Sequence, residues 1–201
     1  MPELTPEDVE AYTKGRLDPS DDETVRMLSV ALNIARREAG WHVCPPRAET
    51  MTIDGPDSRI LWLPTLKLNT LTSVSELGVT LDLATLRKSA GDGPGLPRRV
   101  ALRKRTRGYW TDEYESIVVT MNHGFDEDDA ADWRQAVMSM VDQMSLLPVS
   151  AATGASEFGL TGKRVDDVDY RYGAYASMAE EVVFSINNVL DDYRLPSVEY
   201  F

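Results

Sequence analysis

The chain has 201 residues, enough for one domain or for one domain with an insertion. Its net charge of −12, from 21 basic and 33 acidic residues, argues against a wide basic surface that grips phosphates. It does not exclude a surface past which nucleic acid slides, because like charges repel each other.

Cys44 is the single cysteine, so no intrachain disulfide forms and a reducing compartment is expected. No apolar run approaches the ~20 residues of a membrane-spanning helix. The first residues also lack the basic and apolar pattern of a signal peptide. We therefore expect a soluble chain made in the cytoplasm, with no membrane partner.

Two helices are predicted at the N-terminal end. Thr5 can cap the first, Pro6 suits its first position, and it should end near Gly15. The second, near 21–39, is capped by Ser20 or Asp21 and has apolar residues at helical spacing. That stripe consists of Val25, Leu28, Ala31, Leu32 and Ala35.

The pattern changes at Trp41 and becomes typical of short strands. Strands are predicted at 50–53, 59–63, 66–74, 79–83, 100–102 and 116–121, with turn residues between them. Residues 41–125 are therefore expected to form a small, mostly antiparallel β module.

The β module is expected to return to helix at one continuous junction. The β-branched run at 117–120 is followed by Asn122-His123-Gly124, a turn signal, and then by the acidic run 126–129. Acidic residues favour the positive end of a helix dipole, and an amphipathic helix near 128–147 follows. We expect its apolar face to pack against residues of the other helices: Trp133, Val137, Met140 and Met144 against Leu28, Leu32 and Ile186.

Beyond Pro148 the chain contains a small-residue stretch at 150–162 and a segment at 164–172 that reads as a strand or an extended arm. A third long helix is predicted at 174–191. The predicted fold class is α+β: one domain with a helical bundle (1–40 and 126–192), an inserted small antiparallel β module (41–125) and an extended C-terminal arm (193–201).

A search for catalytic or metal-binding residues favours structural interpretations. His42 and Cys44 could pair as base and nucleophile, or as two metal ligands. A zinc site needs four ligands, and two more are not apparent, so a helix exit and a small buried thiol explain these residues better. His123 could act as a base, but it is more readily explained as a turn residue. Asp126 to Asp129 could bind a cation but lack the spacing of a calcium loop, and helix-start charge explains them better. Asp166, Asp167 and Asp169 are better explained as an exposed polar face. No phosphate-loop, dinucleotide or hydrolase motif occurs. We expect no catalytic residue, no cofactor and no metal.

Two further features concern partners. The basic cluster of Arg103, Lys104, Arg105 and Arg107 lies next to Tyr109 and Trp110, which suits nucleic acid, a solvated strand end or a subunit contact. The acidic background favours a solvated strand end or a subunit contact.

The C-terminal tail, residues 193–201, either folds back on the chain or is buried in a partner, and Pro196 favours an extended arm. The predicted docking residues are Tyr193, Leu195, Pro196, Val198, Tyr200 and Phe201.

The order of parts resembles a family, the head-to-tail connector or head completion adaptor proteins of long-tailed phages. Leu61-Trp62-Leu63-Pro64 with Val74 resembles the family's "LP…V.sV" stretch, and 118–125 (VVTMNHGF) is similar to its "VTYxHGY" stretch. Met121 and Phe125 depart from that pattern. The resemblance covers roughly residues 5 to 148, and the remainder is similar to the extended form in phages of actinobacteria.

The resemblance implies a virion protein of the neck, assembled in the host cytoplasm as a dodecameric ring under the portal protein. Its partners would be the portal, neighbouring copies and the next neck component, the stopper, while DNA passes through without specific binding. The family has no catalytic residues to transfer. The alternatives are another neck component, such as a stopper or tail-completion protein, and an enzyme whose site is not visible in the sequence.

Overall fold

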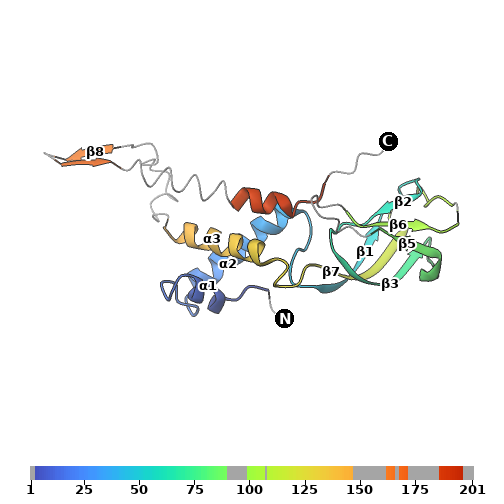
Figure 1. Ribbon diagram of the computed structural model, residues 1–201, viewed down its shortest axis with the longest axis horizontal. Coiled ribbons are helices and arrows are strands. Elements are labelled where there is room, and N and C mark those ends of the chain that lie inside the picture. The colour runs from blue at the N-terminus through green and yellow to red at the C-terminus, as the bar shows by residue number, and fades with distance from the viewer. Residues whose placement is uncertain are drawn as a thin grey trace. The chain divides into compact units, whose positions relative to one another are not determined.

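The computed structural model describes residues 3–89, 99–106, 108–146, 162–165, 168–171 and 186–196, and it shows an α+β chain (Figure 1). The chain divides into two compact units. The β unit comprises Met1–Glu3, Arg36–Ala131 and Asp191–Phe201, and the helical unit comprises Leu4–Ala35 and Asp132–Leu190.

The helices are α1 (Pro6–Tyr12), α2 (Asp22–Ala39) and α3 (Ala131–Leu146). A capping box begins α1: the Thr5 hydroxyl accepts from the Asp8 amide, and the Asp8 carboxylate accepts from the Thr5 amide. The Asp21 carboxylate accepts from the Glu23 amide at 3.0 Å, so Asp21 is the cap of α2. Gly40 ends α2 in the left-handed conformation, at φ +76°.

The helical unit is held by an apolar core and by polar contacts of α3 with α1 and with the segment that follows α1. Tyr12 and Ser139 share a hydrogen bond of 2.7 Å between their hydroxyls, and Arg16 forms an ion pair with Asp142. The buried apolar residues of this unit include Val9, Leu28, Ala31, Leu32, Ala35, Trp133, Ala136, Val137, Val141, Ile186 and Leu190.

The predicted inner face of α3 is confirmed in part. Trp133 and Val137 are buried, as expected, but Met140 and Met144 are only half-buried. Ala136 and Val141 are buried instead. The buried stripe therefore runs i, i+3, i+4, i+8 from Trp133, and the two methionines lie at its margin.

The described part of the β unit contains seven strands in two antiparallel sheets. One sheet has the order β1-β7-β3-β4 and the other β2-β6-β5. The bounds are β1 (Arg47–Ile53), β2 (Ile60–Trp62), β3 (Leu68–Glu76), β4 (Val79–Thr80), β5 (Leu86–Lys88), β6 (Ala101–Lys104) and β7 (Ile117–His123). β7 is the central strand, and every second residue along it is buried.

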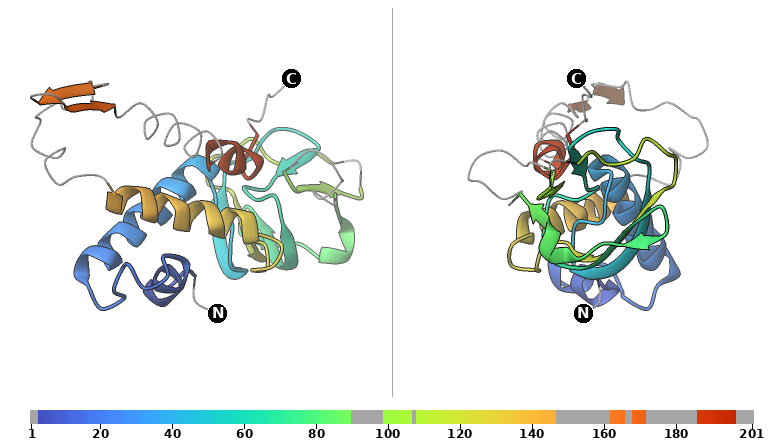
Figure 2. Two further views of the ribbon diagram at one scale, coloured as in Figure 1. Left: turned by 60° about the vertical axis from the view of Figure 1, so that its left-hand side comes forward. Right: turned by 90° about the vertical axis from the view of Figure 1, so that its right-hand side faces the viewer.

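The two sheets enclose one core, and their strands curve around a common interior (Figure 2). The fully buried side chains include Leu61 and Leu102 from one sheet and Val74 and Met121 from the other. Trp110, in the segment that joins β6 to β7, is 1% exposed and completes the core. Both Leu61 and Val74, which carry part of the family resemblance, are therefore packing residues.

Several predicted boundaries shift. The strand expected at 79–83 is only the two-residue β4, followed by a 3-10 turn at Leu83–Thr85 and by β5, which the sequence did not predict. Leu83 and Leu86 face the core from this irregular segment, so no strict alternation marks it. The segment predicted at 164–172 overlaps two strands that pair antiparallel, β8 (Gly162–Val165) and β9 (Val168–Arg171).

The third predicted helix is observed at 186–192, and its expected residues 174–185 lie outside the described part of the chain. The small-residue stretch 150–161 also lies outside it. Among the helices that are described, none is both long and apolar enough to cross a membrane.

Candidate functional site

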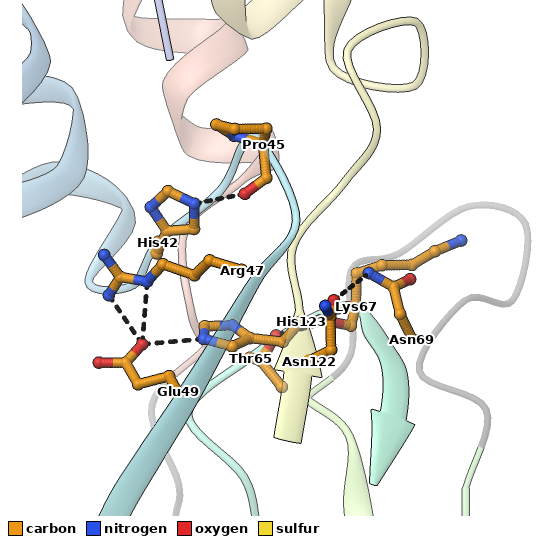
Figure 3. Close-up of polar contacts among 9 residues, drawn as sticks. All are labelled: His42, Pro45, Arg47, Glu49, Thr65, Lys67, Asn69, Asn122 and His123. Carbon is orange, nitrogen blue, oxygen red and sulfur yellow. Dashed lines mark hydrogen bonds and ion pairs between the residues drawn. The ribbon is translucent and has the colours of Figure 1, made fainter. Parts of the chain in front are cut away.

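The segment His123-Gly124-Phe125, which begins with the last residue of β7, is held by several hydrogen bonds. Figure 3 shows His123 there, with Glu49 and Arg47 beside it. The Gly124 amide donates to the Lys67 carbonyl at 3.1 Å, and the Phe125 amide donates to the Val43 carbonyl at 2.7 Å. Asn69 Nδ2 donates to the Gly124 carbonyl at 2.9 Å. Three chain segments thus meet at this junction of the β unit.

Gly124 is required by the backbone at this point. Its φ is +114°, a conformation that residues with a side chain rarely adopt. A Cβ atom here would lie 3.1 Å from the Pro45 carbonyl oxygen and 3.2 Å from Pro46 Cα. The sequence identifies this glycine as a turn residue, but only the structure shows that the backbone of Pro45 and Pro46 approaches it closely.

His123 is fully buried and is tied to an ion pair on β1. Its Nε2 lies 2.9 Å from Glu49 Oε2, and the Arg47 guanidinium donates to the same oxygen at 2.7 Å. Burial alone would raise the pKa of Glu49, but the hydrogen bonds from His123 and Arg47 outweigh it and lower that pKa below 4.5. Glu49 therefore stays ionised and anchors His123.

His42 lies beside this group. Its Nε2 contacts the Pro45 carbonyl at 2.5 Å, and its ring centre is 6.1 Å from that of His123. Burial disfavours the charged imidazole and lowers the pKa of His42 below 6.5. At neutral pH, His42 is therefore a neutral imidazole whose Nε2–H donates a hydrogen bond to the Pro45 carbonyl.

This geometry suits structural ties better than catalysis. A general base must reach a proton on a substrate, but the His123 side chain is 0% exposed. Cys44 is also buried, so its thiol is not presented to a substrate or metal. Within the described ranges, no group of three or more His, Cys, Asp or Glu side chains could hold a metal ion.

An aromatic cluster extends the junction toward the C-terminal end. Trp41 and Phe125 make an edge contact at 5.8 Å, and Phe125 and Tyr193 make another at 5.5 Å. Trp41 Nε1 donates to the Tyr193 carbonyl at 2.8 Å, and the Tyr193 hydroxyl donates to the Asp129 carbonyl at 3.3 Å. Tyr193 is 6% exposed, which corrects its assignment to a docking arm: its side chain is buried within its own chain.

The next residues continue this attachment. Arg194 forms an ion pair with Glu38, and the Leu195 amide donates to the Ala39 carbonyl at 2.9 Å. Leu195 also lies 3.9 Å from the position of a Cβ on Gly40. Pro196 is exposed, and the predicted docking residues Val198, Tyr200 and Phe201 lie outside the described residues.

The charged candidates are dispersed. In the basic cluster, Lys104 pairs with Glu76 at 2.6 Å and lies 4.8 Å from the Trp110 ring, whereas Arg103 and Arg105 are exposed. Arg107 lies outside the described residues. In the acidic run, Asp128 and Asp129 are exposed in the turn before α3. Asp166 and Asp167 are outside the described residues, and the side chain of Asp169 is not described.

No protein-family model and no curated protein matches this chain. Its fold, however, is found in subunits of gene transfer agent (GTA) particles. A chain in the neck of a native GTA particle, computed with C12 symmetry, is 13% identical, with 99% of this chain and 95% of that chain covered at a TM-score of 0.56. A chain in the neck of an empty particle, computed with C6 symmetry, is also 13% identical, with 98% and 91% covered at a TM-score of 0.57.

Proposed function

We propose that this chain is a structural protein of a virion neck: a head-to-tail adaptor that forms a ring beneath the portal protein. One observation carries the proposal. Nearly the whole chain shares its fold with a subunit from the neck of a GTA particle computed with C12 symmetry, and 95% of that subunit is covered. A likeness over the full length of both chains supports equivalent whole subunits rather than a shared small motif.

The junction around His123 supports the same proposal. His123 and Gly124, which match the adaptor pattern, and Phe125, which departs from it, each contact another segment of the β unit. Such contacts fix segments of the β unit relative to one another, which suits a protein that connects two parts of a virion. The two compact units would then act as parts of one adaptor subunit, without catalytic chemistry, first in the host cytoplasm and then in the virion.

The charge of the chain suits the passage of DNA. A ring of subunits with a net charge of −12 each presents negative charge to the phosphate backbone. Repulsion keeps DNA from adhering to the wall of a channel. We propose that the ring lines the DNA path without specific binding and joins the portal on one side and the stopper on the other.

The portal contact is proposed for residues 196–201. Pro196 follows directly after the attachment of Leu195 to α2, and proline disfavours further helix. The aromatic residues Tyr200 and Phe201, with Val198, have the composition of interface anchors. We propose that residues 196–201 dock on the portal.

The decisive experiment mixes the purified chain with the purified portal of the same virus and images the particles by electron microscopy. We expect a ring of this protein on one end of the portal, and portal alone is the control. Binding only to a preassembled portal–adaptor complex would identify another neck component instead. Absence of binding in both mixtures would contradict a neck role.

A further inference from the structure

The turn between β3 and β4 exposes apolar residues in an unfavourable backbone conformation. Leu77 and Gly78 form a two-residue hairpin loop with φ values of +51° and +77°. Asparagine is preferred at the first position of such a turn, because a left-handed conformation strains a branched apolar residue. Leu77 is nevertheless there and is 61% exposed, and Val79 beside it is 65% exposed. A strained and exposed leucine indicates a contact with a partner.

A loop that carries three carboxylates lies beside this turn. The Leu77 amide donates to the Ser116 carbonyl at 2.8 Å, which brings the preceding loop, 112–115, alongside. That loop exposes three acidic residues and Tyr114, which is 86% exposed. None of the three carboxylates forms an ion pair with a described residue. The acidic tip consists of Leu77, Val79, Asp112, Glu113, Tyr114 and Glu115.

The other sheet of the same unit has the opposite character. Arg103 on β6 stands directly opposite Arg87 on β5 and Ile60 on β2, so the three share one face. This is the outer face, because the intervening Leu102 is in the core. Arg105, two residues further, continues the row. Like charges in direct cross-strand register destabilise a sheet, and neither Arg87, Arg103 nor Arg105 has a carboxylate partner among the described residues.

We propose that the acidic tip of one copy docks on the basic row (Ile60, Arg87, Arg103 and Arg105) of the next copy in the ring. The inference rests on the proposed ring and assigns its subunit contact. Each surface offers what the other lacks: unpaired carboxylates with apolar side chains, and unpaired guanidinium groups with an exposed isoleucine. Two different patches on one subunit make a heterologous contact, which is the kind that closes into a ring.

Complementary patches also solve a problem of net charge. Copies that carry −12 each repel one another, so assembly needs local attraction at the contact. The basic row supplies cations that have no carboxylate partner among the described residues. DNA is the competing occupant of that row. Exchanging the charges of the row and the tip distinguishes DNA from a second copy of the chain as the occupant.

The test uses two charge-reversed variants. The row variant carries Arg87→Glu and Arg103→Glu, and the tip variant carries Glu113→Lys and Glu115→Lys. Self-association is measured by sedimentation, with and without portal. Each variant alone should lose self-association by at least about tenfold, because like charges then face each other. Mixed in equal amounts, they should recover it, since wild-type tip meets wild-type row and reversed tip meets reversed row.

Recovery in the mixture also shows that both variants are folded. Normal self-association of either variant, failure of the mixture to recover, or no self-association of the wild type would overturn the proposed contact. DNA binding is measured for the same samples. If the row variant loses DNA binding and mixing with the tip variant does not restore it, the row binds nucleic acid instead. Portal binding with normal assembly of both variants would leave the proposed function intact and this contact wrong.

A third variant, Leu77→Asn, separates docking from stability. Asparagine suits the left-handed position, so the melting temperature of the monomer should rise. The same change removes an apolar side chain from the tip, so self-association should fall several-fold. A Leu77→Asn protein that assembles as well as the wild type would overturn the role of the tip.

Discussion

His42 couples the stability of the β unit to pH. Its pKa lies below 6.5 because burial disfavours the charged ring, so the folded chain binds fewer protons than the unfolded chain just below that pH. The free energy of unfolding should therefore be unaffected above 6.5 and should fall as the pH drops from there toward the lowered pKa. Glu49 acts at lower pH: its stabilising contribution is present above 4.5 and is lost as the pH falls through its lowered pKa.

Urea unfolding of the wild type and a His42→Gln variant from about pH 8 to about pH 5 checks this coupling. The chain has only two histidines, so few other groups titrate in the upper part of this range. The variant should show a flatter pH dependence below 6.5 than the wild type. Equal slopes for the two proteins would mean that His42 does not carry the effect.

Val137 is the residue of α3 that best reports the core of the helical unit. Its side chain is 0% exposed, and Val137→Ala removes two buried carbon atoms. The free energy of unfolding should fall by about 2 kcal/mol, from lost burial and a small cavity. Gln135→Ala, on the exposed side of the same helix, is the matched control and should change it by less than about 0.5 kcal/mol. Similar losses for both would show that this face is not core.

At the scale of elements, Gly124 joins β7 to the segment before α3. Gly124→Ala should destabilise the chain twice over: through its φ of +114° and through contact with the Pro45 and Pro46 backbone. Gly78→Ala is the matched control, because Gly78 has a φ of +77° and nothing within 4 Å of an added Cβ. We expect a loss of about 1 kcal/mol for the control and at least about 1 kcal/mol more for Gly124→Ala, measured by thermal unfolding. Equal losses would mean that the close approach relaxes without cost.

Elements with strong local signals could be predicted from the sequence. Thr5, Asp21 and Gly40 mark helix ends by capping chemistry, and β7 shows the alternation of a half-buried strand. β5 could not be predicted, because its three residues follow a 3-10 turn and carry no periodic pattern. The same holds for tertiary pairing: nothing local indicates that Glu49 meets His123, 74 positions away. The burial of Tyr193 could not be predicted either, because its contact with Trp41 depends on how distant segments fold together.

At the scale of the whole molecule, a fold shared at 13% identity depends on few particular residues. What persists is the fold itself, over 99% of this chain. Within the β unit, distant segments are joined through backbone groups, as in the hydrogen bonds of Phe125 to Val43 and of Leu195 to Ala39. Backbone ties tolerate many side chains, which is consistent with a fold that outlasts sequence similarity.

The attachment of Leu195 decides where a test of portal docking must cut the chain. A truncation that removed Leu195 would also remove its hydrogen bond to Ala39 and would confound docking with stability. Deletion of 197–201 leaves that bond, the Arg194–Glu38 ion pair and the buried Tyr193 in place. The truncated subunit should therefore melt within a few degrees of the wild type. If residues 196–201 dock on the portal, the same subunit should lose portal binding in a pull-down, because its aromatic anchors are gone. Full-length protein is the control, and wild-type affinity of the truncated protein would show that the anchor lies elsewhere.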